Sequence, residues 1–185
     1  MDITIRPATA ADHAAFVRLF PALGVDDPLP APERFAADIA PGMLVAESAA
    51  GVVGYLYMQT LRGVGYVRQV VVDAAARRLG LGERLMRRAA ADLAAAGCAR
   101  WCLNVKPDNA AALALYARLG LAVRYRSTVL RTPWAAARLP APHAEVTVRA
   151  PTPDEERAAE SAFALSPGLL ADAGARPGRL VRNRG

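Results

Sequence analysis

Residues 70–83 decide the fold of this chain and read VVVDAAARRLGLGE. The three valines are a β-branched run of the kind that fills a buried central strand. The loop after them contains Gly80 and Gly82 and opens a helix, whose first N–H groups have no partner within the helix. The helix dipole places partial positive charge there, and Arg77 and Arg78 add more, so the stretch predicts a cradle for an anion.

Two common phosphate motifs do not fit this loop. A P-loop requires Gly, four residues and then Gly-Lys-Ser/Thr, and the sequence contains no such stretch. The dinucleotide fingerprint Gly-x-Gly-x-x-Gly fails because its third position is Leu85, and because the loop follows the fourth predicted strand rather than the first. A plain strand-to-helix turn, in which Gly80 and Gly82 serve the geometry alone, remains open at this point.

Hydrophobic periodicity outward from the loop predicts alternating strands and helices. Extended segments are predicted over 3–6, 43–47, 52–61, 66–73, 100–105 and 121–132. Helices are predicted over 10–23, 32–39, 82–96 and 107–119. The resulting order, β-α-α-β-β-β-α-β-α-β, is that of a mixed, layered α/β domain.

The chain divides into three parts by composition and pattern. Residues 1–132 contain the α/β domain, and residues 133–144, rich in Pro and Ala, are expected to be a linker. Residues 145–185 are too few for an independent core.

This last segment repeats the beginning of the chain. Residues 146–149 read Val-Thr-Val-Arg where residues 3–6 read Ile-Thr-Ile-Arg. Thr152 then mirrors Thr9, and each is followed three residues later by an acidic residue that can complete a capping box. We expect an incomplete second copy of the first unit, although a chance likeness between two strand-turn-helix segments remains open.

Two signatures, in this order, resemble the GNAT superfamily of acetyltransferases. Arg77-x-x-Gly80-x-Gly82 after the fourth strand resembles that family's acyl-CoA pyrophosphate loop. Residues 103–120 resemble its second signature, in which an Asn precedes a helix carrying Ala, then Leu-Tyr, then Gly. The resemblance covers residues 1–132 and implies the GNAT acyl-CoA N-acyltransferase fold, a central mixed sheet with helices on both faces. It implies an enzyme that moves an acetyl group from acetyl-CoA to an amine.

The resemblance also implies roles for individual residues. In the family the fourth and fifth strands splay apart, which leaves backbone groups for the pantetheine arm, and the following helix start holds the pyrophosphate. Tyr116 matches the catalytic residue that protonates the departing thiolate. The cofactor-binding residues implied are Val70, Val71, Val72, Arg77, Arg78, Leu79, Gly80, Leu81, Gly82, Glu83 and Asn109.

The fourth strand departs from the family's pattern. Arg68 stands where many members carry a Glu that acts as base or orients water, and Gln69 follows it. Glu47 or a water chain is then expected to take the place of this base.

Asp26 and Asp27 lie between the first two helices, where the family often builds its acceptor pocket. They could attract an amine or simply form a solvated turn. An active N-acetyltransferase and a non-catalytic acyl-CoA-binding or regulatory module both remain open.

The amino-acid composition limits the classes of partner that the chain is expected to bind. The net charge is +6, but the arginines are scattered and lack interleaved aromatic residues, so we expect no nucleic-acid partner. Cys98, Cys102, His13 and His143 do not have the tight spacing of structural zinc ligands, so no metal is expected. The sequence contains no run of 18 apolar residues and no secretion signal, which predicts a cytoplasmic protein without a membrane partner. The expected partners are acetyl-CoA and an amine acceptor, bound by a monomer or homodimer.

Overall fold

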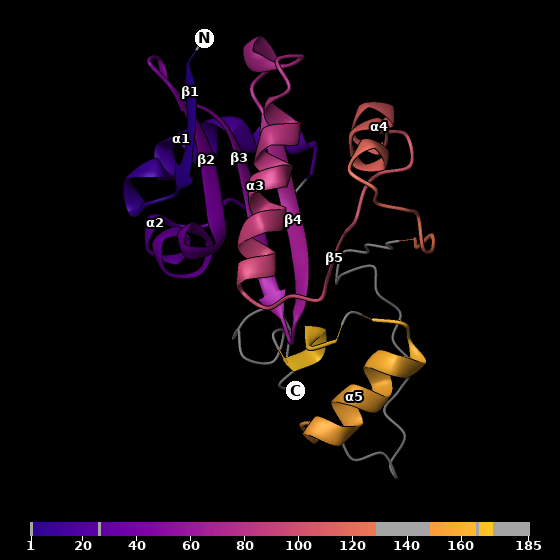
Figure 1. Cartoon of the computed structure of the whole chain (residues 1–185). Helices are drawn as coiled ribbons and strands as arrows, with labels where there is room; N and C mark the ends of the chain where they lie inside the picture. The colour runs from indigo at the N-terminus through magenta and orange to yellow at the C-terminus, as the bar shows by residue number, and fades with distance from the viewer. Residues whose placement is uncertain (1, 26, 129–148, 166, 172–185) are drawn as a thin grey trace, which may run out of the picture.

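The computed structural model describes residues 2–25, 27–128, 149–165 and 167–171. Within them a five-stranded sheet has the order β1-β2-β3-β4-β5 (Figure 1). The first four strands pair antiparallel, and β5 lies parallel to β4. The strands are β1 Ile3–Pro7, β2 Met43–Ser48, β3 Gly51–Leu61, β4 Val64–Val72 and β5 Arg100–Leu103.

Helices connect the strands in the predicted order. Before β2 come the 3-10 turn Ala10–Asp12, α1 His13–Leu19, the 3-10 turn Phe20–Leu23, α2 Pro32–Arg34, the π-helical turn Phe35–Ile39 and the 3-10 turn Ala40–Gly42. After β4 come the 3-10 turn Ala74–Ala76, α3 Leu81–Ala95, α4 Ala110–Arg118 and α5 Pro153–Ala162. The mixed α/β class predicted from the periodicity is confirmed.

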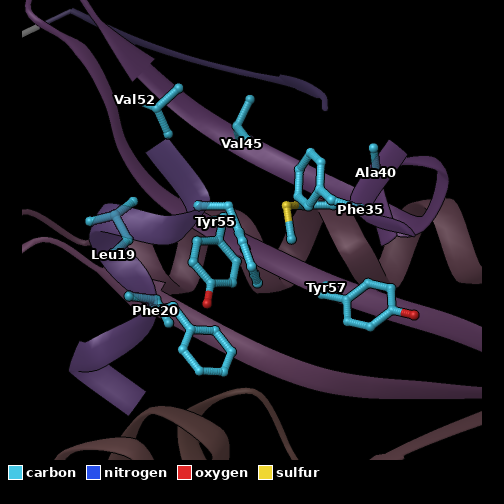
Figure 2. Packing of buried hydrophobic residues seen from close by; sticks show 11 residues of the cluster. Leu19, Phe20, Phe35, Ala40, Val45, Val52, Tyr55 and Tyr57 are labelled. Carbon is cyan, nitrogen blue, oxygen red and sulfur yellow. The ribbon is translucent and has the colours of Figure 1, made fainter. Parts of the chain in front are cut away.

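Aromatic side chains hold α1 and α2 on one face of the sheet. The Phe16 ring centroid lies 5.1 Å from that of Phe35 and 5.3 Å from those of Phe20 and Tyr55. Figure 2 shows Phe20, Phe35 and Tyr55 within this cluster. Burial of one such apolar side chain contributes about 1.5–3 kcal/mol, so the cluster fixes both helices against the strands.

The opposite face is covered by α3. Leu81, Leu85, Met86 and Ala89 are buried against the strands, and their spacing of three and four residues gives the apolar stripe that the sequence predicted. β4 therefore has a helical layer on each face, and its carboxyl end leads into the loop that starts α3 (Figure 1).

Local signals explain where the first helix begins. Thr9 and Asp12 form the predicted capping box, in which Asp12 Oδ2 accepts from Thr9 N at 2.7 Å. The carboxylate of Asp12 is buried and also accepts from Arg6 at 2.8 Å. Arg6 and Thr9 together provide hydrogen-bond partners for the buried carboxylate of Asp12.

The predicted extended segment over 121–132 is wrong in its described part. Residues 121–128 form neither helix nor strand. Val123 and Tyr125 are 72% and 61% exposed. A strand needs a neighbour that supplies ladder hydrogen bonds, and among the described residues none pairs with the outer edge of β5. Residues 129–132 lie outside the described residues.

The C-terminal part begins with the second predicted capping box. Thr152 N donates to Glu155 Oε2 at 2.8 Å, and α5 follows. Arg62, in the turn between β3 and β4, pairs with Glu156 of α5 at 3.5 Å. The predicted linker 133–144 and nearly all of the repeated strand lie outside the described residues, so the second copy and the domain boundaries stay predictions.

Candidate active site

β4 and β5 separate partway along their length. Their parallel pairing runs from Val64 opposite Arg100 to Val67 opposite Leu103. Beyond Val67, the rest of β4 pairs with β3 alone in the part of the chain that the structure describes. Figure 1 shows the chain after β5 turning away from β4 toward α4. On this side, β4 beyond Val67 has no paired strand among the described residues, which is the arrangement that an added strand requires.

A β-bulge lies at this separation. Tyr57 of β3 pairs with Gln69, and the next residue, Met58, pairs with Val67. Arg68 is therefore the extra residue on β4. Such a bulge bends the strand and redirects side chains locally, here where β5 leaves the sheet.

Nearby side chains hold Arg68 and Gln69, the two residues at the bulge. Arg68 Nε donates to Gln59 Oε1 at 2.5 Å, and the guanidinium carbon lies 5.0 Å from the centroid of the Tyr66 ring. Tyr55 donates its hydroxyl to Gln69 Oε1 at 3.2 Å. Burial raises the pKa of Tyr55, so this hydroxyl stays protonated and remains a donor. Arg68 and Gln69 are thus held by side chains of β3 and β4 at the point where β5 leaves the sheet.

Glu47 does not reach this point. It pairs with Val52 of β3, which lies five residues before Tyr57, a separation of roughly 17 Å along a strand. Its carboxylate accepts from Arg6 Nε at 2.8 Å, and this bond holds the pKa of Glu47 below its usual range. The expectation that Glu47 replaces the missing base is therefore wrong, and a water chain is the remaining expected substitute.

The loop after β4 is anchored at its margins and exposed at its centre. Asp73 caps the 3-10 turn, and its carboxylate pairs with Arg18 of α1 at 2.7 Å. Arg77 Nε donates to the carbonyl of Val72 at 3.1 Å. The four residues 77–80 are exposed. These contacts fix the loop without covering the backbone that begins α3.

The start of α3 presents N–H groups that have no acceptor within the helix. Gly80 is the N-cap, with φ 73°, and it has no side chain that could cap them. The first helical bond runs from Arg84 N to Gly80 O at 3.0 Å. The N–H groups of Leu81, Gly82 and Glu83 precede it. Together with the dipole of a long helix, they give this helix start the geometry that the predicted anion cradle requires.

The two loop glycines are needed for different reasons. A Cβ on Gly80 would meet nothing within 4 Å, so this backbone can be approached closely from outside. A Cβ on Gly82 would lie 3.3 Å from Leu115 Cδ2, which is tighter than ordinary contact. Gly82 therefore allows α4 to pack on the start of α3, whereas the sequence had grouped both glycines with the phosphate.

α4 carries the remaining two predicted site residues. Asn109 is its N-cap, and Asn109 Oδ1 accepts from Ala112 N at 3.1 Å. The Nδ2 hydrogens of Asn109 are not used by this cap and can donate to a cofactor. Tyr116, two turns later, is half-buried and packs on the same cluster as Val70 and Val72. Burial raises the pKa of Tyr116 above its usual value near 10, so the phenol is protonated at neutral pH.

The predicted site residues form one continuous region. The valines lie on the open part of β4, residues 77–83 form the loop and helix start, and Arg118 of α4 lies 3.8 Å from Glu83. Leu79 is 54% exposed at the centre of this loop. Arg77 and Arg78 are exposed at the same loop.

Two polar contacts beside this region were missed by sequence reasoning. Arg18 holds Asp73, as described above, and Lys106 Nζ donates to the carbonyl of Gly24 at 2.7 Å. The only sequence signal for the second was that Lys106 is the sole lysine among 23 basic residues. Asp26 lies outside the described residues, and Asp27 is exposed.

Potential metal ligands and nucleophiles are scattered. Cys98 and Cys102 are not in a disulfide, and Cys98 Sγ lies 3.8 Å from Thr60 Oγ1. Among the described residues there is no group of three or more His, Cys, Asp or Glu side chains that could hold a metal ion. The same residues include no helix that is both long and apolar enough to cross a membrane.

Known proteins resemble this chain in sequence. A model of the acetyltransferase (GNAT) family matches residues 13–121. Glucosamine 6-phosphate N-acetyltransferase 1 of Oryza sativa subsp. japonica is 41% identical over 73 residues, 40% of this chain and 44% of the relative. The probable glucosamine 6-phosphate N-acetyltransferase 2 of the same organism is 38% identical over 137 residues, 64% of this chain and 81% of the relative. The chain thus spans less than half of the first relative and about four fifths of the second.

Solved structures share the fold. An acetyltransferase from Trypanosoma brucei matches with a TM-score of 0.56 and 25% identity, over 71% of this chain and 100% of the other. An aminoglycoside N-acetyltransferase solved in complex with CoA matches with a TM-score of 0.59 and 18% identity, over 71% and 95%. The predicted fold is confirmed. Because the family model covers more than half of the sequence, the chain belongs to the acetyltransferase (GNAT) family.

Proposed function

We propose that the chain is an acetyl-CoA-dependent N-acetyltransferase. The observation that carries the proposal is the open side of β4 beyond Val67, which leads directly to the helix start at Gly80. A pantetheine arm carries amide groups that can bond to a strand edge, and a pyrophosphate suits the N–H groups of a helix start. The unpaired side of β4 and the start of α3 follow one another along the chain. A single ligand that contains both a pantetheine arm and a pyrophosphate requires this arrangement.

The cofactor contacts follow from this arrangement. The backbone of Val70, Val71 and Val72 would bind the pantetheine arm, and the backbone of residues 77–83 would bind the pyrophosphate. The open space in front of Gly80 supports close approach of a phosphate. Asn109 would donate from Nδ2 to a pantetheine carbonyl while its Oδ1 keeps the helix cap.

Acetyl-CoA supplies an acetyl thioester, which an amine can attack directly. The amine nitrogen forms a bond to the acetyl carbonyl carbon, and the carbon–sulfur bond breaks. Tyr116 would donate its proton to the departing sulfur and regain one from water. A backbone N–H of β4 would stabilise the charge that develops on the carbonyl oxygen. Cys102 lies in the ladder opposite Tyr66, which supports a packing role rather than an acyl-carrying one.

The attacking amine must also lose a proton, and Tyr116 does not accept it. The side chain at the bulge is that of Arg68, where many family members carry a Glu, and Glu47 is remote. We propose that water takes this proton. The reaction then uses the neutral amine, so kcat/KM should rise with pH until the acceptor amine is fully deprotonated.

The acceptor is proposed to be a primary amine of a small molecule, and an amino sugar phosphate is the first candidate. Both rice relatives are named as glucosamine 6-phosphate N-acetyltransferases, which supports this choice. The second candidate function is a non-catalytic acyl-CoA-binding or regulatory module, which Arg68 at the usual position of the base favours. Tyr116 and Asn109 at the expected places on α4 favour the enzyme.

Thiol release separates these functions. The chain is incubated with acetyl-CoA and glucosamine 6-phosphate, glucosamine, a diamine or a peptide, and free thiol is measured together with the mass of the product. An enzyme should give thiol and acetylated amine in equal amounts with one acceptor. CoA binding without product from any amine would support the module, and absence of CoA binding would refute both.

We also propose a domain organisation, an oligomeric state and a location for the whole chain. Residues 1–132 would form the catalytic domain, 133–144 a linker and 145–185 an appended segment, in a cytoplasmic monomer or homodimer without a nucleic-acid partner. Analytical ultracentrifugation measures the oligomeric state, and cell fractionation measures the location. A particle larger than a dimer, or recovery in a membrane fraction, would contradict this part.

A further inference from the structure

The loop on the α1 side of the sheet is fastened at both ends. Gly24 ends the turn after α1 in the left-handed conformation, with φ 61°, and its carbonyl accepts from Lys106 Nζ at 2.7 Å. At the other end, the carbonyl of Pro30 lies 3.0 Å from His13 Nε2. Residues 24, 25 and 27–31, called the acceptor-side loop below, are thus held at one end by Lys106 and at the other by His13 of α1.

Lys106 belongs to the start of α4. Its own carbonyl accepts the N–H of Asn109 at 3.1 Å, and Asn109 is the residue that caps α4. Lys106 and the helix cap therefore form one hydrogen-bonded turn. A ligand that holds Asn109 in place also holds the root of the lysine side chain.

The Lys106–Gly24 bond joins the two faces of the sheet. Gly24 directly follows a turn whose Phe20 lies in the core on the α1 face. α4 instead packs, through Tyr116, on the core of the opposite face. Lys106 lies three residues after the end of β5, just beyond the last β4–β5 pair, and its bond to Gly24 is exposed at the surface.

We propose that Lys106 is a positioning residue that couples acetyl-CoA binding to the acceptor-side loop; this rests on the proposed function. Cofactor contacts at Asn109 hold the turn that carries Lys106, and the ammonium group then holds Gly24 and the loop that follows it. A charged donor makes a stronger bond to a carbonyl than a neutral one does. By linkage, a loop held for the acceptor must also favour the cofactor by the same factor.

Hydrogen exchange with CoA as the probe tests the coupling without any acceptor. In the wild type, CoA should slow exchange of the peptide covering the acceptor-side loop, because a loop with a fixed partner opens less often. Lys106→Met keeps the aliphatic stem and removes the donor, and CoA should no longer slow its loop. Lys106→Arg should respond as the wild type does. Arg100→Met, at the exposed start of β5, removes the same charge elsewhere and should also respond normally.

Kinetics provide the second measurement. On an acceptor identified by thiol release, Lys106→Met should raise the acceptor KM at saturating acetyl-CoA roughly fivefold or more. By the same coupling it should raise the acetyl-CoA KM at saturating acceptor, with Lys106→Arg close to wild type. A wild-type loop that ignores bound CoA, or a Lys106→Met loop that responds fully, overturns the proposal. A wild type that binds CoA and shows the loop response but acetylates no amine refutes the proposed function and leaves the coupling standing.

Discussion

Replacing Gly80 by Ala tests the cofactor loop without filling space inside the protein. Gly80 has φ 73°, and the new Cβ would meet nothing within 4 Å, so in the free protein the change acts through backbone strain alone. Holding an L-residue in the left-handed region costs about 1–2 kcal/mol. At about 2–4 °C per kcal/mol for a chain of this size, we expect the melting temperature to fall by roughly 2–8 °C.

In the CoA-bound protein the same Cβ has a second effect. It would stand in front of the N–H groups that are proposed to hold the pyrophosphate, so CoA affinity should fall roughly tenfold or more, about 1.4 kcal/mol. Gly97→Ala is the matched control. Gly97 has φ 78°, a Cβ there also meets nothing within 4 Å, and it lies past the far end of α3. This variant should lose similar stability and keep full affinity.

Calorimetric titration and thermal melts with CoA separate the two effects. At a CoA concentration of one hundred times the wild-type Kd, the ligand stabilises the fold by about 2.7 kcal/mol, and after a tenfold loss of affinity by about half of that. Gly97→Ala should show the full gain and Gly80→Ala the reduced one. If folded Gly80→Ala binds CoA as tightly as Gly97→Ala, the pyrophosphate does not lie at this loop.

Three further changes test other parts of the account. Tyr116→Phe should lower the rate of the chemical step roughly 10²-fold while CoA affinity and melting temperature change little, because the ring remains; equal single-turnover rates would remove Tyr116 from the mechanism. The bond from Arg6 lowers the pKa of Asp12, so the stability that this carboxylate contributes is complete above its ordinary pKa near 4 and is lost as pH falls through the lowered value. Urea unfolding should therefore show a shallower acid loss in Asp12→Asn, and parallel acid profiles would contradict this. A chain that ends at residue 140 should fold and bind CoA; an unfolded product would show that later residues complete the first domain.

The features that could be predicted from sequence are encoded within a few neighbouring residues. The capping box of Thr9 and Asp12 and the apolar stripe of α3 each follow from side chains three or four positions apart. The predicted family followed from two such local signatures, and the family match confirms it. The roles given to the individual site residues remain predictions.

The features that could not be predicted depend on residues far apart in the chain. The bulge at Arg68 interrupts a stretch that looks like one regular strand, because it arises from the register with β3. The need for glycine at position 82 comes from Leu115 of α4, which no pattern around the loop reveals. Residues 121–128 have strand-forming side chains, but the described chain supplies no partner strand for them.

A crystal structure of the chain with CoA would show where the cofactor binds. We expect the pantetheine arm to bond to the backbone of Val70–Val72 on the free side of β4, with the pyrophosphate at Gly80–Glu83. We also expect the Tyr116 hydroxyl to lie about 3 Å from the sulfur or one water away from it. CoA bound elsewhere, or a Tyr116 hydroxyl turned away from the sulfur with Val70–Val72 unoccupied, would contradict the account.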